Sequence, residues 1–102
     1  MNDYKVLIST EFDTMVDNNL SYIKVLSNSY VRSISIQISY FILLLEKFPF
    51  AFPRFTLPND ISRLRKITIN KRYYLIYQVT DNIVEILYFA DGRRSTERLL
   101  MY

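Results

Sequence analysis

Basic side chains are concentrated in the C-terminal half of the chain, where they could bind a negatively charged partner. Residues 52–102 contain nine Lys and Arg against five Asp and Glu, a net charge of +4, whereas residues 1–51 contain four against five, a net charge of −1. This asymmetry suggests a polyanion or an acidic protein as partner, and the alternative is a solvated basic face without a ligand. Seven of these nine cations lie in or near the strand-like runs described below: Arg63, Arg65, Lys66, Lys71, Arg72, Arg93 and Arg94.

Tyrosines lie among these cations and allow two interpretations. They could stack on bases, as aromatic side chains do in proteins that bind single strands. Since they fall in runs of β-branched and aromatic residues, half-buried positions in a sheet are favoured instead. Glu85 is the only acid in an otherwise apolar run, and we expect it to pair with a cation across the sheet, without a catalytic role. The tyrosines are Tyr73, Tyr74, Tyr77 and Tyr88.

The chain contains no Cys and no His, which excludes several kinds of chemistry. Disulfides, thiolate nucleophiles, Cys/His zinc sites and histidine acid–base pairs all require these residues. RNA cleavage by attack of a 2′-hydroxyl would need a base, an acid and cations for the phosphorane. Only Lys, Arg, Tyr, Glu or Asp could supply those groups here. No cofactor or metal is predicted.

The cations and tyrosines fall in three strand-like runs, Leu64–Ile69, Tyr73–Val79 and Ile83–Phe89, which predict an antiparallel meander. The turns between them, residues 70–72 and 81–82, are short and polar. Side chains alternate along a strand, so Arg65 and Lys66 should point to opposite faces of the sheet.

The N-terminal half predicts a strand and two helices. Residues 4–9 read as a short strand, Thr10 as an N-cap, and residues 11–27 as an amphipathic helix, ended by a break at residues 27–29 that also supplies a new cap. Residues 30–47 are ambiguous because residues 33–39 alternate like a strand, but their length without Gly or Pro favours a helix. The Pro-bearing aromatic loop 48–55 should fold onto the sheet edge or the helix ends, where core packing is favoured over an aromatic ligand box. The tail 95–102 could be a partial helix or a last strand.

The length and the composition of the chain indicate one folded domain, residues 1–102. Half of the residues are apolar and 16% are aromatic, which excludes a disordered chain. The N-terminus lacks the layout of a signal peptide, and the longest apolar run, residues 40–45, is too short to span a bilayer. We therefore expect a cytoplasmic protein without a membrane partner.

The order of elements and several segments resemble the RelE/ParE superfamily of bacterial toxins. The likeness covers nearly the whole chain and implies an α+β fold, in which an N-terminal strand and a two-helix hairpin pack on an antiparallel sheet. It also implies the growth-inhibiting toxin of a type II toxin–antitoxin, or plasmid stabilisation, module, neutralised by a cognate antitoxin that covers its sheet and helices. The segments that carry the resemblance are Pro49, Pro53-Arg54, Leu64-Arg65-Lys66-Ile67, Tyr73–Val79, Ile86-Leu87-Tyr88-Phe89 and Gly92-Arg93-Arg94.

The resemblance offers two kinds of target. The RelE-like branch cleaves mRNA on the ribosome and uses two basic residues on the first meander strand, an Arg on the next strand, and an Arg and a Tyr after the last. Lys66 and Arg93 match two of these positions and would be the catalytic residues of a ribonuclease. The other three positions fall at Thr68, Tyr74 and near Leu99. Lys71, Arg72 or Tyr88 could substitute only with a geometry of their own.

Since three of the five positions do not match, the sequence favours the ParE-like branch, which poisons DNA gyrase without being a nuclease. The alternatives are a ribosome-dependent mRNA endonuclease and an inactive remnant that only binds an antitoxin. In each case the first helix and the exposed sheet edges could take up the antitoxin. The residues proposed to contact the target or a nucleic acid are Arg63, Arg65, Lys71, Arg72, Arg94 and Tyr88.

Overall fold

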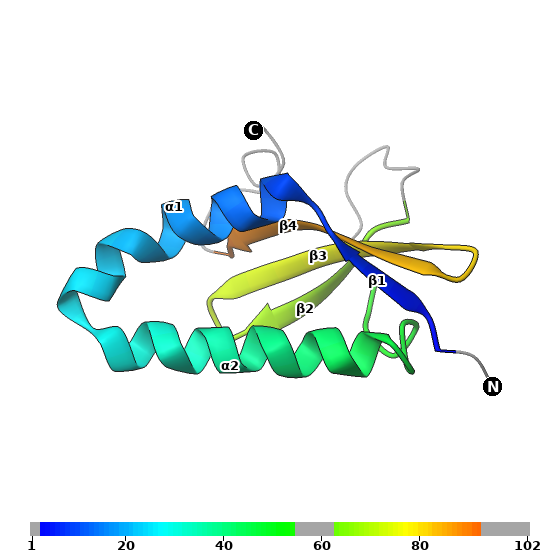
Figure 1. The fold of residues 1–102 in the computed structure, drawn as a ribbon, viewed down its shortest axis with the longest axis horizontal. Coiled ribbons are helices and arrows are strands. Elements are labelled where there is room, and N and C mark those ends of the chain that lie inside the picture. Colours follow the sequence, from blue (N-terminus) through cyan, green and yellow to red (C-terminus); the bar gives the residue numbers. More distant parts are fainter. Residues whose placement is uncertain (1–2, 55–62, 93–102) are drawn as a thin grey trace.

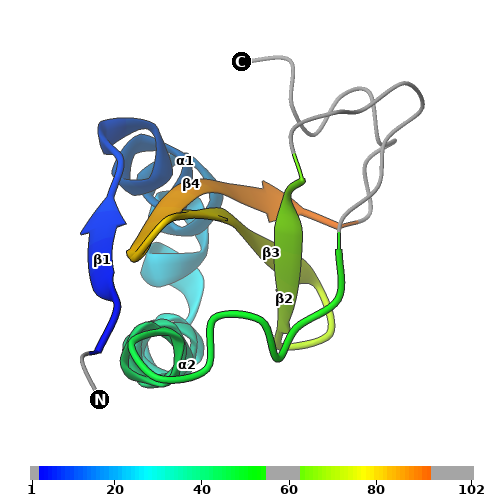
Figure 2. The ribbon, with the colours of Figure 1, turned by 90° about the vertical axis from the view of Figure 1, so that its right-hand side faces the viewer.

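A computed structural model describes residues 3–54 and 63–92, and it shows an α+β fold (Figure 1). The elements follow in the order β1 (Lys5–Ile8), α1 (Thr10–Leu26), α2 (Asn28–Leu45), β2 (Arg65–Ile69), β3 (Tyr73–Thr80) and β4 (Ile83–Asp91). The strands form one sheet in the order β1-β4-β3-β2, and both helices pack on one side of it (Figure 2). The expected strand, helical hairpin and meander are confirmed.

The meander is antiparallel, whereas β1 joins its far side in parallel. β2 pairs with β3 and β3 with β4 in antiparallel register, and β1 runs parallel to β4 from Lys5↔Ile83 to Ile8↔Ile86. The whole sheet is therefore mixed. Tyr77 lies opposite Ile86 and Ile76 opposite Tyr88, so Leu87 is an extra residue that forms a bulge in β4.

The first helix begins one residue earlier than the sequence suggested. Ser9, not Thr10, is the N-cap: its backbone is extended and its Oγ accepts a hydrogen bond from the Phe12 N–H at 3.0 Å. The same hydroxyl donates to the Leu87 carbonyl of β4 at 2.8 Å. This long-range bond explains the correction, because it fixes Ser9 outside the helix.

The ambiguous segment is helical. Ser27 ends α1 and also caps α2, where its Oγ accepts a hydrogen bond from the Tyr30 N–H at 3.3 Å. Within α2, Ile34 and Leu45 are fully buried against the sheet. The strand interpretation of residues 33–39 was therefore wrong, and length was the better guide than alternation.

The helices and the sheet share one hydrophobic core. Its aromatic centre is Phe89, whose ring stacks on Tyr73 at 5.0 Å and meets the edge of Phe12 from α1 at 5.8 Å. Tyr73 and Tyr77 are 0% exposed, which excludes stacking of these two rings on bases. In residues 3–54 and 63–92, no helix is long and apolar enough to cross a membrane.

The β2–β3 turn requires an uncommon backbone. Asn70 and Lys71 have φ of 55° and 57°, and the Arg72 N–H donates to the Ile69 carbonyl at 3.1 Å, which is the pattern of a type I′ turn. Asp81, in the β3–β4 turn, also has a positive φ, of 55°. The two hairpins are thus formed without Gly, as expected for the second of them.

Candidate functional site

The sheet presents two chemically different faces, and the register assigns each side chain to one of them. Arg65 lies opposite Tyr77 and shares the side of the helices, where the Tyr77 hydroxyl donates to the Pro49 carbonyl at 2.7 Å. Lys66 lies opposite Ile76, which lies opposite Tyr88, and by alternation this row lies on the other side of the sheet from Arg65. The expected separation of Arg65 and Lys66 is confirmed. We call the side of Lys66 the distal face.

The distal face brings together three positions that the resemblance had aligned. Thr68 and Tyr74 form a cross-strand pair, and the Lys66 Nζ lies 4.5 Å from the centroid of the Tyr74 ring. This distance is that of a cation–π contact. Two of the three positions that are basic in the RelE-like pattern thus carry a hydroxyl and a phenol, next to a single lysine.

Tyr88 shares the distal face but lies two strands away from Lys66, about 10 Å from it at the usual strand spacing. It borders a hollow of about 280 Å³ along α1, together with Glu11 and Met15. Glu85 accepts a hydrogen bond from the Gln78 side chain at 3.4 Å. In the described residues Glu85 thus pairs with an amide and not with a cation.

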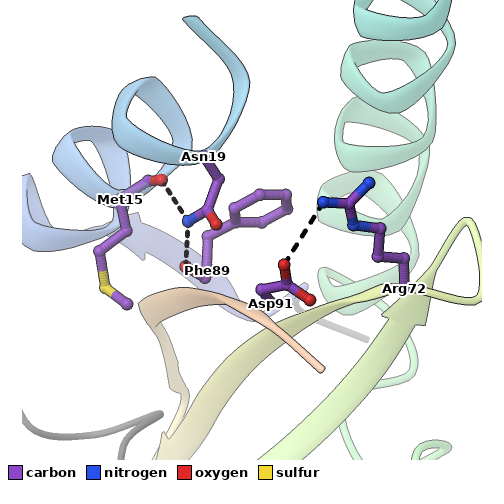
Figure 3. A network of polar contacts seen from close by, with 5 residues as sticks. All are labelled: Met15, Asn19, Arg72, Phe89 and Asp91. Atoms are coloured by element: carbon purple, nitrogen blue, oxygen red, sulfur yellow. Dashed lines mark hydrogen bonds and ion pairs between the residues drawn. The ribbon is translucent and has the colours of Figure 1, made fainter. Parts of the chain in front are cut away.

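Arg72 is held on the other side of the sheet by Asp91 (Figure 3). Its Nη2 lies 3.5 Å from the Asp91 Oδ2, and its guanidinium lies 5.0 Å from the centroid of the Tyr73 ring. Asp91 is only 8% exposed. The side chain of Arg72 therefore joins the β2–β3 turn to the end of β4, and the structure does not bring it together with Lys66.

Asn19 secures the same end of β4 from α1. Its Nδ2 donates to the Met15 carbonyl at 2.7 Å and to the Phe89 carbonyl at 3.4 Å (Figure 3). β1 pairs with β4 only as far as Ile86, and beyond that residue α1 lies along the edge of β4 in place of β1. This contact fixes the position of Asp91 two residues later.

Three arginines converge on a cavity at the start of β2. The cavity has a volume of about 510 Å³ and is lined by Phe50, Arg54, Arg63, Arg65 and Val79. The sequence had indicated Arg63 and Arg65 as binding residues but not Arg54. A pairing between distant segments places Arg54 there: it forms an antiparallel bridge with Arg65, and the Lys66 N–H donates to the Pro53 carbonyl at 3.1 Å. The expected docking of this loop on the sheet edge is confirmed.

The aromatic residues of the loop divide between core and surface. The Phe52 ring packs edge-on against Phe41 of α2 at 5.7 Å, as expected for core packing. Phe48 and Phe50 are 57% and 58% exposed. Phe50 is already in contact with Tyr4 edge-on and with the Arg65 guanidinium, so it does not form an open aromatic box.

Burial perturbs two tyrosines of β3. It raises the pKa of Tyr77 to about 12, an effect that the nearby charge of Arg65 partly opposes. Burial, and to a smaller degree the neighbouring Tyr30 hydroxyl, raises the pKa of Tyr73 to about 12. Both phenols therefore stay neutral at physiological pH, and neither is suited to act as a base.

The remaining site residues are spread out or lie beyond the described ranges. Lys71 is exposed at the tip of the β2–β3 turn. Arg93, Arg94, Leu99 and the tail 95–102 fall outside the described residues.

No protein-family model matches the chain, and no curated protein sequence matches it significantly.

Proposed function

We propose that this protein is the toxin of a type II toxin–antitoxin module and that it acts on its target without cutting RNA, as ParE-like toxins do. The observation that carries this proposal is the Thr68–Tyr74 pair on the distal face. Two positions that are basic in the RelE-like pattern lie side by side there, and neither is charged. The toxin would act in the cytoplasm, with DNA gyrase as the candidate target.

The chemistry of the distal face argues against a ribonuclease. Cleavage of RNA requires cations close to the phosphorane and a base within hydrogen-bond reach of the 2′-hydroxyl. The Lys66 ammonium sits over the Tyr74 ring, and Glu85 pairs with Gln78 in another row of the sheet. A lysine placed in this way can bind an anionic or aromatic surface.

An uncovered apolar stripe on α2 supports an antitoxin as partner. Ile36, Tyr40 and Leu43 are 63%, 57% and 64% exposed, and their spacing places them on one side of the helix. Exposed apolar stripes of this kind commonly mark protein interfaces. An amphipathic antitoxin segment laid along α2 would cover these side chains.

The second candidate function, a ribosome-dependent mRNA endonuclease, is favoured by one observation. Lys66 and Tyr88 lie in the same row of the distal face, on either side of Ile76, which is 0% exposed. In that mechanism Lys66 and Arg93 would be catalytic, with Tyr88 in place of the missing terminal tyrosine.

Expression of the chain in bacteria, followed by parallel measurement of message integrity and DNA supercoiling, separates these functions. A gyrase poison should arrest growth and change supercoiling while translated messages stay intact. Rapid message cleavage that is lost in Lys66→Ala or Arg93→Ala would overturn the non-nuclease mechanism. Lys24→Ala is the matched control, since Lys24 is an exposed cation on α1. Normal growth at high expression would instead indicate a remnant that only binds its antitoxin.

A further inference from the structure

We infer that the cavity formed by Arg54, Arg63 and Arg65 is a binding site for carboxylate side chains of an acidic peptide segment in a partner protein. The inference goes beyond the proposed function and does not depend on it, because the cavity lies on the helix side of the sheet and not on the distal face. Figure 2 shows the loop after α2 running beside β2, where this cavity is formed.

Positive charge is concentrated in this cavity. All three arginines line one cavity of about 510 Å³, and the other described residues that line it, Phe50 and Val79, are apolar. Within residues 3–54 and 63–92, none of the three guanidinium groups forms an ion pair with an acid. Like charges that share a cavity repel one another, and a bound anion removes this repulsion.

The backbone of the loop and of β2 sets the positions of the arginines. Arg54 is fixed by its bridge to Arg65, and the Arg65 Nη1 donates to the Phe52 carbonyl at 2.7 Å. Arg63 has a φ of 59°, a left-handed conformation that is costly for a residue with a side chain. Arg65 keeps most of its five N–H donors for a ligand. The backbone positions of the arginines and the side chain of Arg65 are thus set before binding, which lowers the entropic cost of binding.

The side chains that line the cavity favour one class of anion. Planar guanidinium forks match carboxylates in a bidentate geometry. A single-stranded nucleic acid would also need an aromatic surface for its bases. Among the described residues that line the cavity, the aromatic ring is that of Phe50, which already has the Arg65 guanidinium 5.1 Å from its centroid and Tyr4 against it edge-on. Lys66, the next cation along β2, points to the opposite face. These features favour an acidic peptide over a nucleic acid.

Fluorescence anisotropy with purified protein tests the inference. The probes are a labelled oligoglutamate peptide, an oligoglutamine peptide of the same length, and oligouridylate, all at low salt. We expect the oligoglutamate to bind and the oligoglutamine not to bind. The double variant Arg54→Gln/Arg63→Gln should weaken oligoglutamate binding by about tenfold or more, because it removes two charge-assisted contacts. Both side chains are exposed, so the fold should be preserved.

A matched double variant controls for net charge. Lys24→Gln/Arg32→Gln removes the same charge from exposed positions near the α1–α2 connection, at the opposite end of the hairpin from the cavity (Figure 1). It should change oligoglutamate binding by less than about twofold. Arg65→Lys keeps the charge but loses the planar fork, and we expect several-fold weaker binding.

Three outcomes would overturn the inference. They are absence of oligoglutamate binding at about 1 mM peptide, an equal loss of binding in the two double variants, and tighter binding of oligouridylate through the same arginines. None of these outcomes bears on growth inhibition, so a failure here is distinguishable from a failure of the proposed toxin function.

Discussion

Removal of the Tyr77 hydroxyl should destabilise the protein at neutral pH but have a smaller effect at high pH. Tyr77 lies in the middle of β3, is 0% exposed, and donates a hydrogen bond to the Pro49 carbonyl at 2.7 Å. Tyr77→Phe keeps the ring and leaves that buried carbonyl without a donor. The expected loss in the free energy of unfolding is about 1–3 kcal/mol at neutral pH.

The pH dependence follows from the pKa of Tyr77, which burial raises to about 12 from its ordinary value of 10.0. The folded state therefore holds the phenolic proton more tightly than the unfolded chain. The stabilising contribution is complete below pH 10 and is lost as the pH rises from 10 towards 12. At about pH 11 the wild type should have lost about 1.4 kcal/mol through this group. Tyr77→Phe lacks the phenol, so the difference in the free energy of unfolding between the wild type and this variant should be smaller at about pH 11 by the same amount.

Urea unfolding of the wild type and of Tyr77→Phe, at about pH 7.5 and about pH 11, measures the difference in the free energy of unfolding at each pH. Tyr73 titrates in both proteins, so its contribution cancels. Tyr40→Phe is the control at neutral pH, because its hydroxyl belongs to a side chain that is 57% exposed, and it should leave the free energy of unfolding unchanged. A Tyr77→Phe difference of the same size at both pH values would refute the argument.

Three further changes test the β2–β3 turn and its contact with β4. Gly92→Ala should destabilise by about 1–3 kcal/mol in urea unfolding, because an added Cβ would lie 2.8 Å from the Arg72 carbonyl and 3.0 Å from the Tyr74 ring. Lys71→Gly should stabilise by about 0.5 kcal/mol by relieving the left-handed backbone, whereas Lys71→Ala should not. Asp91→Asn should lower the melting temperature and reduce the free energy of unfolding by about 1–2 kcal/mol, because it removes the charge opposite Arg72. An equal reduction in the exposed variant Asp81→Asn would contradict this prediction.

The meander and the helical hairpin could be predicted from the sequence because local residue patterns determine them. Runs such as Tyr73–Val79 combine β-branched and aromatic residues with polar turns on either side. The segment 30–47 shows the limit of periodicity, since residues 33–39 alternate like a strand and yet form part of α2. Length decided correctly there, because a strand of that length without a turn would be exceptional.

The features that could not be predicted from the sequence depend on contacts between residues that are far apart in the chain. Ser9 replaces Thr10 as the cap because its hydroxyl also reaches Leu87, and nothing near residue 9 signals this bond. Likewise, no local pattern places Arg54 beside Arg65, and the pairing of Arg72 with Asp91 requires the turn between them to close on β4. Charge counts located the basic half of the chain correctly but could not divide its cations between two faces.

That division has a consequence for the proposed module. Arg65 and Lys66 are neighbours in sequence but face opposite sides of the sheet, so an acidic antitoxin segment in the arginine cavity would leave the distal face free. The two sites should then separate genetically. Arg54→Gln/Arg63→Gln should keep growth inhibition and weaken neutralisation by the antitoxin, whereas Lys66→Ala should weaken growth inhibition and keep antitoxin binding. Both properties can be measured by co-expression and pull-down with a candidate antitoxin. Loss of both properties in either variant would mean that one surface serves target and antitoxin alike.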